Sequence, residues 1–309
     1  MPTDVAAPSI RQGFSIPLVV GGMVGLQFSS AFVQDLFGLI GPTGAALLRI
    51  LLSAGLLWLI ARPSVAVVRE HWRLLLPYGL VLAVMQLAFY EAIARLPLGV
   101  VVTLEFTGPL LVGLFLSRKA SDVVWVVLAG AGIVLLGGIH TLEDPVGVLA
   151  SLVVAASLAG YILLGTAVSR VTSQLSGLAV AMAIASVVAI PSAGVIGVPA
   201  PAELVDPGVL LAALGVAVFA TVLPFSLEFV AMRHIPRRVF AVLVTLEPVI
   251  AAVVGFLVLH EVLSVLQLVA MVCVVLAALG SSREILRRKS HGEYGERARD
   301  RAGAGAGPL

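Results

Sequence analysis

Long apolar segments separated by short polar ones run through almost the whole chain. About 20 apolar residues in a helix cross the hydrocarbon core of a bilayer, and somewhat shorter helices are tolerated when they tilt or are interrupted. The pattern predicts ten membrane-spanning helices, at residues 14–34, 43–60, 74–94, 98–116, 123–139, 146–168, 175–195, 208–231, 239–257 and 263–280. The first segment is longer than the apolar part of a secretory signal, so we interpret it as a retained helix.

Composition supports an all-α, polytopic integral membrane protein. The 309 residues are 60% hydrophobic and only 12% charged, whereas about a quarter of the residues of soluble domains are charged. The single cysteine, Cys273, lies in an apolar run and cannot form a disulfide within one chain, so we predict a structural thiol. The five histidines show no metal-binding spacing, and we predict neither a metal nor a cofactor.

The basic residues predict the orientation. Of the 19 lysines and arginines, all except Arg95 and Arg49 fall on the same side of the predicted helices, together with both termini. Cytoplasmic loops are rich in Lys and Arg, so we expect both termini in the cytoplasm and the loop Gly197 to Pro207 outside. Basic residues after Ser281 predict a tail that attracts anionic lipid.

The second half of the chain repeats the first. Residues 103–105 (TLE) recur at 245–247, and a proline follows each copy, at Pro109 and Pro248. Five helices per half is an odd number, so the two halves insert in opposite senses, which is the geometry of an inverted repeat. The predicted organisation is a cytoplasmic tail (1–13), a first five-helix repeat (14–140), a second five-helix repeat (146–281) and a basic disordered cytoplasmic tail (282–309).

Two glutamates lie inside apolar segments, at comparable places in the two halves. Glu105 and Glu247 approach the middle of the membrane from opposite sides, and each is near a proline. A charge there costs on the order of 2.5–3.5 kcal/mol even on the lenient insertion scale, so such residues usually face a protein interior or a wet cavity. Each glutamate could bind an ammonium group or exchange a proton. It could also brace a helix that proline and glycine have opened.

A second group of polar candidates lies on three other helices. Glu91 and Glu228 precede proline-containing corners in the third and eighth helices, and Gln86 and Tyr90 share one face of the third. Tyr161 is on the sixth helix. These side chains suit a cavity for a hydroxylated amino acid, although hydrogen bonds between helices explain them nearly as well.

Two further residues complete the set. Gln27 lies on a polar face of the first helix, next to Gly21-x-x-x-Gly25, which permits a close neighbour. Arg49 is the one cation within a predicted span. Its guanidinium could hold a substrate carboxylate or neutralise a glutamate, and we favour the second role.

Several segments resemble a known transporter family. They are FYEAIARLPLGVVVTLEFTGP at 89–109, LPFSLEFVAMRHIPRRVF at 223–240, TLEPVIAAVVG at 245–255 and HEVLSVLQL at 260–268. They resemble the EamA-type families of the drug/metabolite transporter superfamily, and within them the inner-membrane threonine/homoserine exporters. The resemblance implies a cavity between helices 1, 3, 4, 6, 8 and 9, with helices 5 and 10 behind it.

The resulting hypothesis is a proton-driven exporter of small polar metabolites such as threonine or homoserine, in a bacterial-type inner membrane. Its expected partners are the substrate, protons and membrane lipid, without nucleic acid, and a homodimer is left open. No P-loop motif indicates ATP hydrolysis. One alternative is a transporter of the same superfamily for another amino acid, a purine or a cationic compound. The other is a membrane-embedded enzyme, which the absence of a paired His or G-x-S-x-G motif disfavours.

Overall fold

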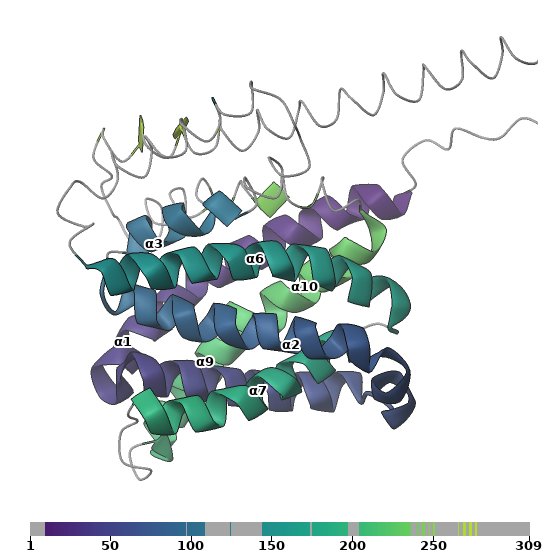
Figure 1. Cartoon of the computed structure of the whole chain (residues 1–309), viewed down its shortest axis with the longest axis horizontal. Helices are drawn as coiled ribbons and strands as arrows, with labels where there is room; N and C mark the ends of the chain where they lie inside the picture. Colours follow the sequence, from purple (N-terminus) through teal and green to yellow (C-terminus); the bar gives the residue numbers. More distant parts are fainter. Residues whose placement is uncertain are drawn as a thin grey trace, which may run out of the picture.

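A computed structural model describes residues 10–96, 98–108, 124, 144–173, 175–196 and 204–235, together with single residues between 240 and 276 (Figure 1). These residues form helices and turns, and the described part contains no β-strand. Predictions that concern the remaining residues, including most of the fifth, ninth and tenth helices and both tails, lie outside the described part.

The described helices follow one another with short connections. They are α1 (Ile10–Ala61), α2 (Val65–Ile93), α3 (Leu98–Glu105), α6 (Pro145–Val171), α7 (Ser176–Ile196), α9 (Pro207–Ala217), the π-helical turn η2 (Val218–Val222) and α10 (Leu223–His234). Four segments are long and apolar enough to cross a membrane, namely Leu36–Ala61, Val65–Ile93, Pro145–Val171 and Pro207–His234.

Helix α1 comprises two helices joined at Gly41. Gly41 has φ 66° and ψ 172°, a conformation outside the helical region that glycine adopts without the steric cost of a Cβ. The chain turns there, so that residues 10–40 and 42–61 occupy different places in the bundle (Figure 1). These two helices correspond to the two predicted at 14–34 and 43–60.

Some predicted boundaries are wrong. Helix α2 begins at Val65, nine residues before the predicted start, because Arg69, Glu70 and Arg73 fall in its first turns. Hydropathy marks the part of a helix that is buried in lipid, whereas charged residues can continue the same helix into water. The first helix similarly begins at Ile10 and continues to residue 40.

Close packing organises the centre of the bundle. Helix α2 packs against α6 on one side and α7 on the other, and α1 contacts α7, α9 and α10 (Figure 1). A Cβ added at Gly79 of α2 would lie 2.6 Å from the Cβ of Ile184 in α7, so glycine permits this approach. A central cluster of buried residues that includes Tyr78, Tyr161 and Phe229 joins α2, α6 and α10.

Two helices of the second half begin with the same local signal. Asp144 caps α6 by accepting hydrogen bonds from the amides of Val146 and Gly147, and Asp206 caps α9 in the same way. A proline occupies the first turn of each helix, where its missing N–H is not needed.

Candidate functional site

Arg49 projects from the second part of α1 onto the π-helical turn η2. Its Nε donates a hydrogen bond to Thr221 Oγ1 at 2.7 Å, and its Nη2 donates to the carbonyl of Ala220 at 2.8 Å. Its Nη1 lies 3.5 Å from Tyr90 Oη, and the guanidinium is 5.5 Å from the centre of the Tyr90 ring. Arg49 is therefore held by neutral groups of α2 and η2 in this structure.

Tyr161 and Glu228 form the most direct polar contact between the helices of the second half. Tyr161 Oη of α6 donates a hydrogen bond to Glu228 Oε2 of α10 at 2.8 Å. Glu228 is 9% exposed and Tyr161 is fully buried. Sequence reasoning had selected both residues for a cavity, and the structure brings them together.

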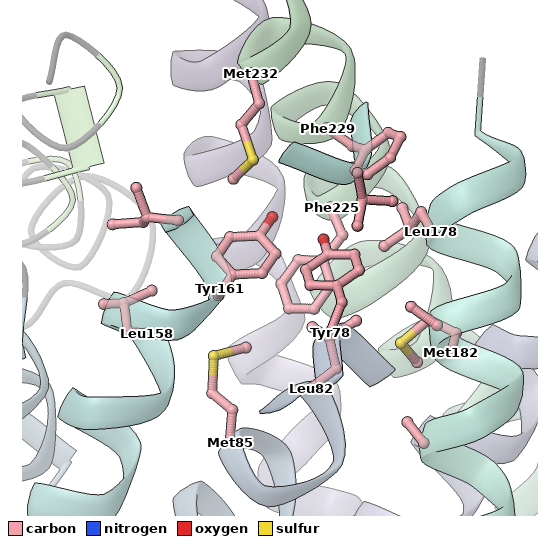
Figure 2. Packing of buried hydrophobic residues seen from close by; sticks show 14 of the residues in the cluster. Tyr78, Leu82, Met85, Leu158, Tyr161, Leu178, Met182, Phe225, Phe229 and Met232 are labelled. Carbon is pink, nitrogen blue, oxygen red and sulfur yellow. The ribbon is translucent and has the colours of Figure 1, made fainter. Parts of the chain in front are cut away.

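Aromatic rings surround this contact. The Tyr78 ring stacks on that of Tyr161 with a centroid distance of 6.0 Å, and Phe229 stacks on the other side of Tyr78 at 6.3 Å. Phe225 lies 5.4 Å from Tyr161. Figure 2 shows the two tyrosine hydroxyls pointing in the same direction, toward the side of Met232 and Phe229. Aromatic faces beside a carboxylate are suited to an ammonium group.

Two buried oxygens near these residues lack hydrogen-bond partners among the described residues. They are Tyr78 Oη and Gln86 Oε1, both on α2. The amide nitrogen of Gln86 contacts Met182 Sδ at 3.6 Å. A buried polar atom without a partner costs about 1–3 kcal/mol, so a ligand that supplies the missing hydrogen bonds would be favoured here.

The remaining glutamates face the same region. Glu105, at the end of α3, interacts electrostatically with Arg49 and Glu228, and Glu247 interacts with Glu105 and Glu228. We call Glu105, Glu228 and Glu247 the carboxylate cluster. Helix α3 ends at Glu105, followed by a turn at Phe106, so an interruption adjoins this carboxylate as expected.

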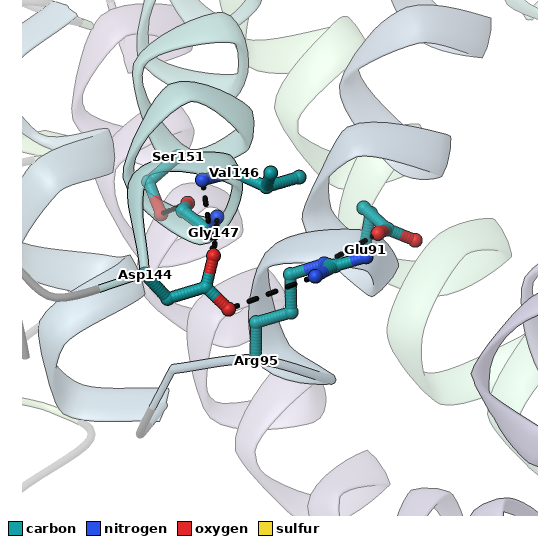
Figure 3. A network of polar contacts seen from close by, with 6 residues as sticks. All are labelled: Glu91, Arg95, Asp144, Val146, Gly147 and Ser151. Carbon is teal, nitrogen blue, oxygen red and sulfur yellow. Dashed lines mark hydrogen bonds and ion pairs between the residues drawn. The ribbon is translucent and has the colours of Figure 1, made fainter.

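Glu91 lies apart from the carboxylate cluster. Arg95 Nε donates to Glu91 Oε1 at 2.6 Å, and Arg95 Nη1 lies 3.6 Å from Asp144 Oδ2 (Figure 3). The network connects the end of α2 to the start of α6. Hydrogen bonds from the Gly147 and Val146 amides, together with Arg95, lower the pKa of Asp144, and the bond to Glu91 raises the pKa of Arg95. The structure thus pairs Glu91 with a surface network.

The helix that carries Gln27 packs tightly against α10. The Gln27 side chain lies outside the described residues, so its predicted role stays a prediction. A Cβ at Gly22 would be 3.2 Å from Pro224 Cα, and one at Gly25 would be 3.1 Å from Leu223 Cδ2. The expected close neighbour of this glycine-rich face is therefore α10.

Comparison with known proteins identifies the family. The profile of the EamA-like transporter family matches residues 145–283. The threonine/homoserine exporter RhtA of Salmonella typhimurium (strain LT2) is 36% identical over 269 residues, which cover 86% of this chain and 90% of the relative. RhtA of Escherichia coli (strain K12) is 35% identical over 271 residues, with the same coverage. This chain belongs to the EamA-like transporter family.

A solved crystal structure shares the fold of this EamA-like protein. It aligns with a TM-score of 0.65 at 17% sequence identity and covers 89% of this chain and 98% of the solved one. Family membership and the four apolar helices together make this EamA-like protein a multi-pass membrane protein, and its relatives are transporters.

Sequence reasoning missed two residues of the EamA-like site. Tyr78 is buried against Tyr161, and Thr221 accepts the hydrogen bond from Arg49. Tyr78 lies two helical turns before Gln86, but its position reads equally well as an interfacial tyrosine. Thr221 precedes Pro224 by three residues, and a hydroxyl so close to an intramembrane proline is the signal that could have found it.

Proposed function

We propose that this EamA-like protein exports threonine, homoserine or related amino acids across a bacterial inner membrane, with both termini in the cytoplasm. Ten helices in two inverted repeats, 14–140 and 146–281, would alternate access to one site in exchange for protons. The observation that carries this proposal is the 35–36% identity to exporters named for these substrates over 86% of the chain. The carboxylate cluster, inside an otherwise apolar bundle, supports it.

The carboxylate cluster suits both the substrate and the coupling ion. A zwitterionic amino acid needs an anion beside its ammonium group, and Glu228 retains one oxygen that Tyr161 does not occupy. Three carboxylates close together also favour the uptake of a proton, because like charges in a low-dielectric site repel one another. Binding of the ammonium and of a proton would then be mutually exclusive, which is what antiport requires.

The unpartnered oxygens offer a basis for hydroxyl selectivity. Gln86 Oε1 can only accept a hydrogen bond, and Tyr78 Oη can donate or accept one. A site that pairs a substrate hydroxyl discriminates strongly against analogues that lack it, because the buried partners then remain unpaired. Valine is nearly isosteric with threonine and should be a poor substrate.

Transport into inverted membrane vesicles tests the proposal. Vesicles that contain the protein should accumulate labelled threonine or homoserine when their interior is acidified, and an uncoupler should abolish the uptake. Valine in excess should compete poorly. Equal transport of valine, or transport of a purine or a cationic dye without amino acids, would leave a transporter of the same superfamily with another substrate.

Two variants test the carboxylates directly. Glu105→Gln and Glu247→Gln should accumulate in the membrane yet lose most transport, because an amide cannot exchange a proton. Glu70→Gln is the matched control, since the Glu70 side chain is 74% exposed at the start of α2. If either cluster variant transports at the parental rate, that glutamate has only a bracing role.

A further inference from the structure

The buried face of the eighth predicted helix changes position along its length. Before η2 the buried residues recur at the helical spacing of three and four, as Val209, Ala213, Val216 and Ala220. Continued without interruption, this stripe would place Leu223 and Leu227 in the core. Leu223 is instead 38% exposed and Leu227 is half-buried, whereas Glu228 is 9% exposed.

The π-helical turn accounts for this shift. The amide of Leu223 donates to the carbonyl of Val218, five residues earlier, so the turn contains one more residue than an α-helical turn. One residue corresponds to about 100° of rotation in a helix of 3.6 residues per turn. Beyond η2 the buried stripe accordingly advances by one position and continues as Thr221, Phe225, Glu228 and Met232. The turn therefore brings Glu228, in place of Leu227, against Tyr161.

The next proline explains why the turn needs support from another helix. Pro224 has no N–H, so the carbonyl of Ala220 lacks the donor that an α-helix would provide four residues later. Arg49 Nη2 donates to this carbonyl at 2.8 Å, while its Nε holds the hydroxyl of the adjacent Thr221. Ser53, one turn after Arg49, donates to the carbonyl of Ala217 at 3.3 Å.

We propose that Arg49 is a positioning residue that stabilises the π-helical turn and thereby sets the rotation of Glu228 toward Tyr161. This role differs from both roles that the sequence suggested for Arg49, because it acts through the backbone of η2. It rests on the proposed exporter function only in that Glu228 belongs to the transport site. The geometry itself is independent of the substrate.

Cysteine cross-linking measures the rotation without disturbing Tyr161 or Glu228. A Cβ at Gly21 would lie 3.8 Å from Leu227 Cδ1, so Gly21→Cys with Leu227→Cys should cross-link in a Cys273→Ala background. Loss of the π-helical turn would rotate residue 227 away from residue 21. The control pair is Leu96→Cys with Gly147→Cys, which joins α2 to α6 far from η2, since a Cβ at Gly147 would be 2.8 Å from Leu96 Cγ.

Arg49→Gln should lower the cross-linking rate of the 21/227 pair by about tenfold, the factor that one charge-assisted hydrogen bond contributes to a local equilibrium. The control pair should cross-link at the parental rate. Thr221→Val, which keeps the side-chain shape and removes the acceptor for Nε, should act in the same direction and more weakly. It decides the question if Arg49→Gln fails to accumulate.

Parental cross-linking of the 21/227 pair in these variants would overturn the inference. If transport were lost while the cross-link persisted, Arg49 would act on the substrate directly and the exporter function would stand. Reduced cross-linking in a protein whose parent carries no amino acid would refute the proposed substrate and retain the positioning role. The two proposals therefore fail separately.

Discussion

The hydrogen bond between Tyr161 and Glu228 makes a quantitative prediction. Tyr161→Phe removes the donor and Glu228→Gln removes the charge, so the two variants and their combination form a double-mutant cycle. The donor-acceptor distance of 2.8 Å and the burial of both groups indicate a fully formed bond. A hydrogen bond to a charged group contributes about 1.5–3 kcal/mol, whereas one to a neutral group contributes about 0.5–1.5 kcal/mol. The cycle therefore reports the charge on Glu228 as well as the contact.

The assay is reversible unfolding in mixed detergent micelles, measured at several pH values. Glu228→Gln mimics the protonated side chain, so the coupling free energy should be about 2 kcal/mol where Glu228 is ionised and should fall below about 1 kcal/mol where it is protonated. The coupling must consequently rise with pH. A proton-exchanging carboxylate requires that both forms occur within the range in which the protein works.

Tyr78→Phe is the matched control for this cycle. Tyr78 belongs to the same aromatic group, but its hydroxyl has no hydrogen-bond partner among the described residues, so its removal should cost little or should stabilise the protein. Its coupling with Glu228→Gln should remain well below that of Tyr161→Phe. Coupling of Tyr161 to Glu228 that is near zero at every pH would refute the reasoning.

Three further predictions concern packing, helix capping and topology. Gly79→Ala should lower the free energy of unfolding by about 1–3 kcal/mol, less the gain in helix propensity, because its Cβ would lie 2.6 Å from an α7 side chain. Gly55→Ala, with nothing within 4 Å of the new Cβ, should be neutral or gain up to about 1 kcal/mol, and thermal unfolding in detergent distinguishes the two. Asp144→Ala should lower the unfolding temperature at neutral pH. Because the pKa of Asp144 is lowered in the fold, its contribution is present above the ordinary aspartate pKa of about 4 and disappears as the pH falls through its folded value, where the variant and parent should converge. In intact cells, an impermeant thiol reagent should label a cysteine placed at Ala200 but not one at Ser290, and the reverse result would contradict the orientation.

Hydropathy predicted the helices of the second half to within a few residues. The segment predicted at 146–168 is α6 at Pro145–Val171, and the one predicted at 175–195 is α7 at Ser176–Ile196. Apolar composition and the Asp-Pro capping signal both end close to the membrane boundary at these places. The start of α2 was wrong because composition does not distinguish a helix that continues into water from a polar loop.

The π-helical turn and the pairing of polar groups could not be predicted in the same way. A π-helical turn contains the same apolar residues as an α-helical one, and only Pro224 in the sequence indicates a break. The sequence selected Tyr161 and Glu228 as candidates, but their contact joins residues 67 positions apart and depends on the rotation of α10. Glu91 passed the same test of composition, yet Arg95, four residues later, pairs with it at the end of the helix.

The one-residue turn at Gly41 has a practical consequence for anyone who modifies this protein. The first two helices are joined by Gly41 and Pro42 without a loop, so no segment between them can accept an inserted epitope or protease site without separating the helices. A side chain at Gly41 would also have to adopt φ 66°, although nothing else within 4 Å would obstruct it. This junction is therefore a point at which a probe of the extracytoplasmic face would report its own disruption of the fold.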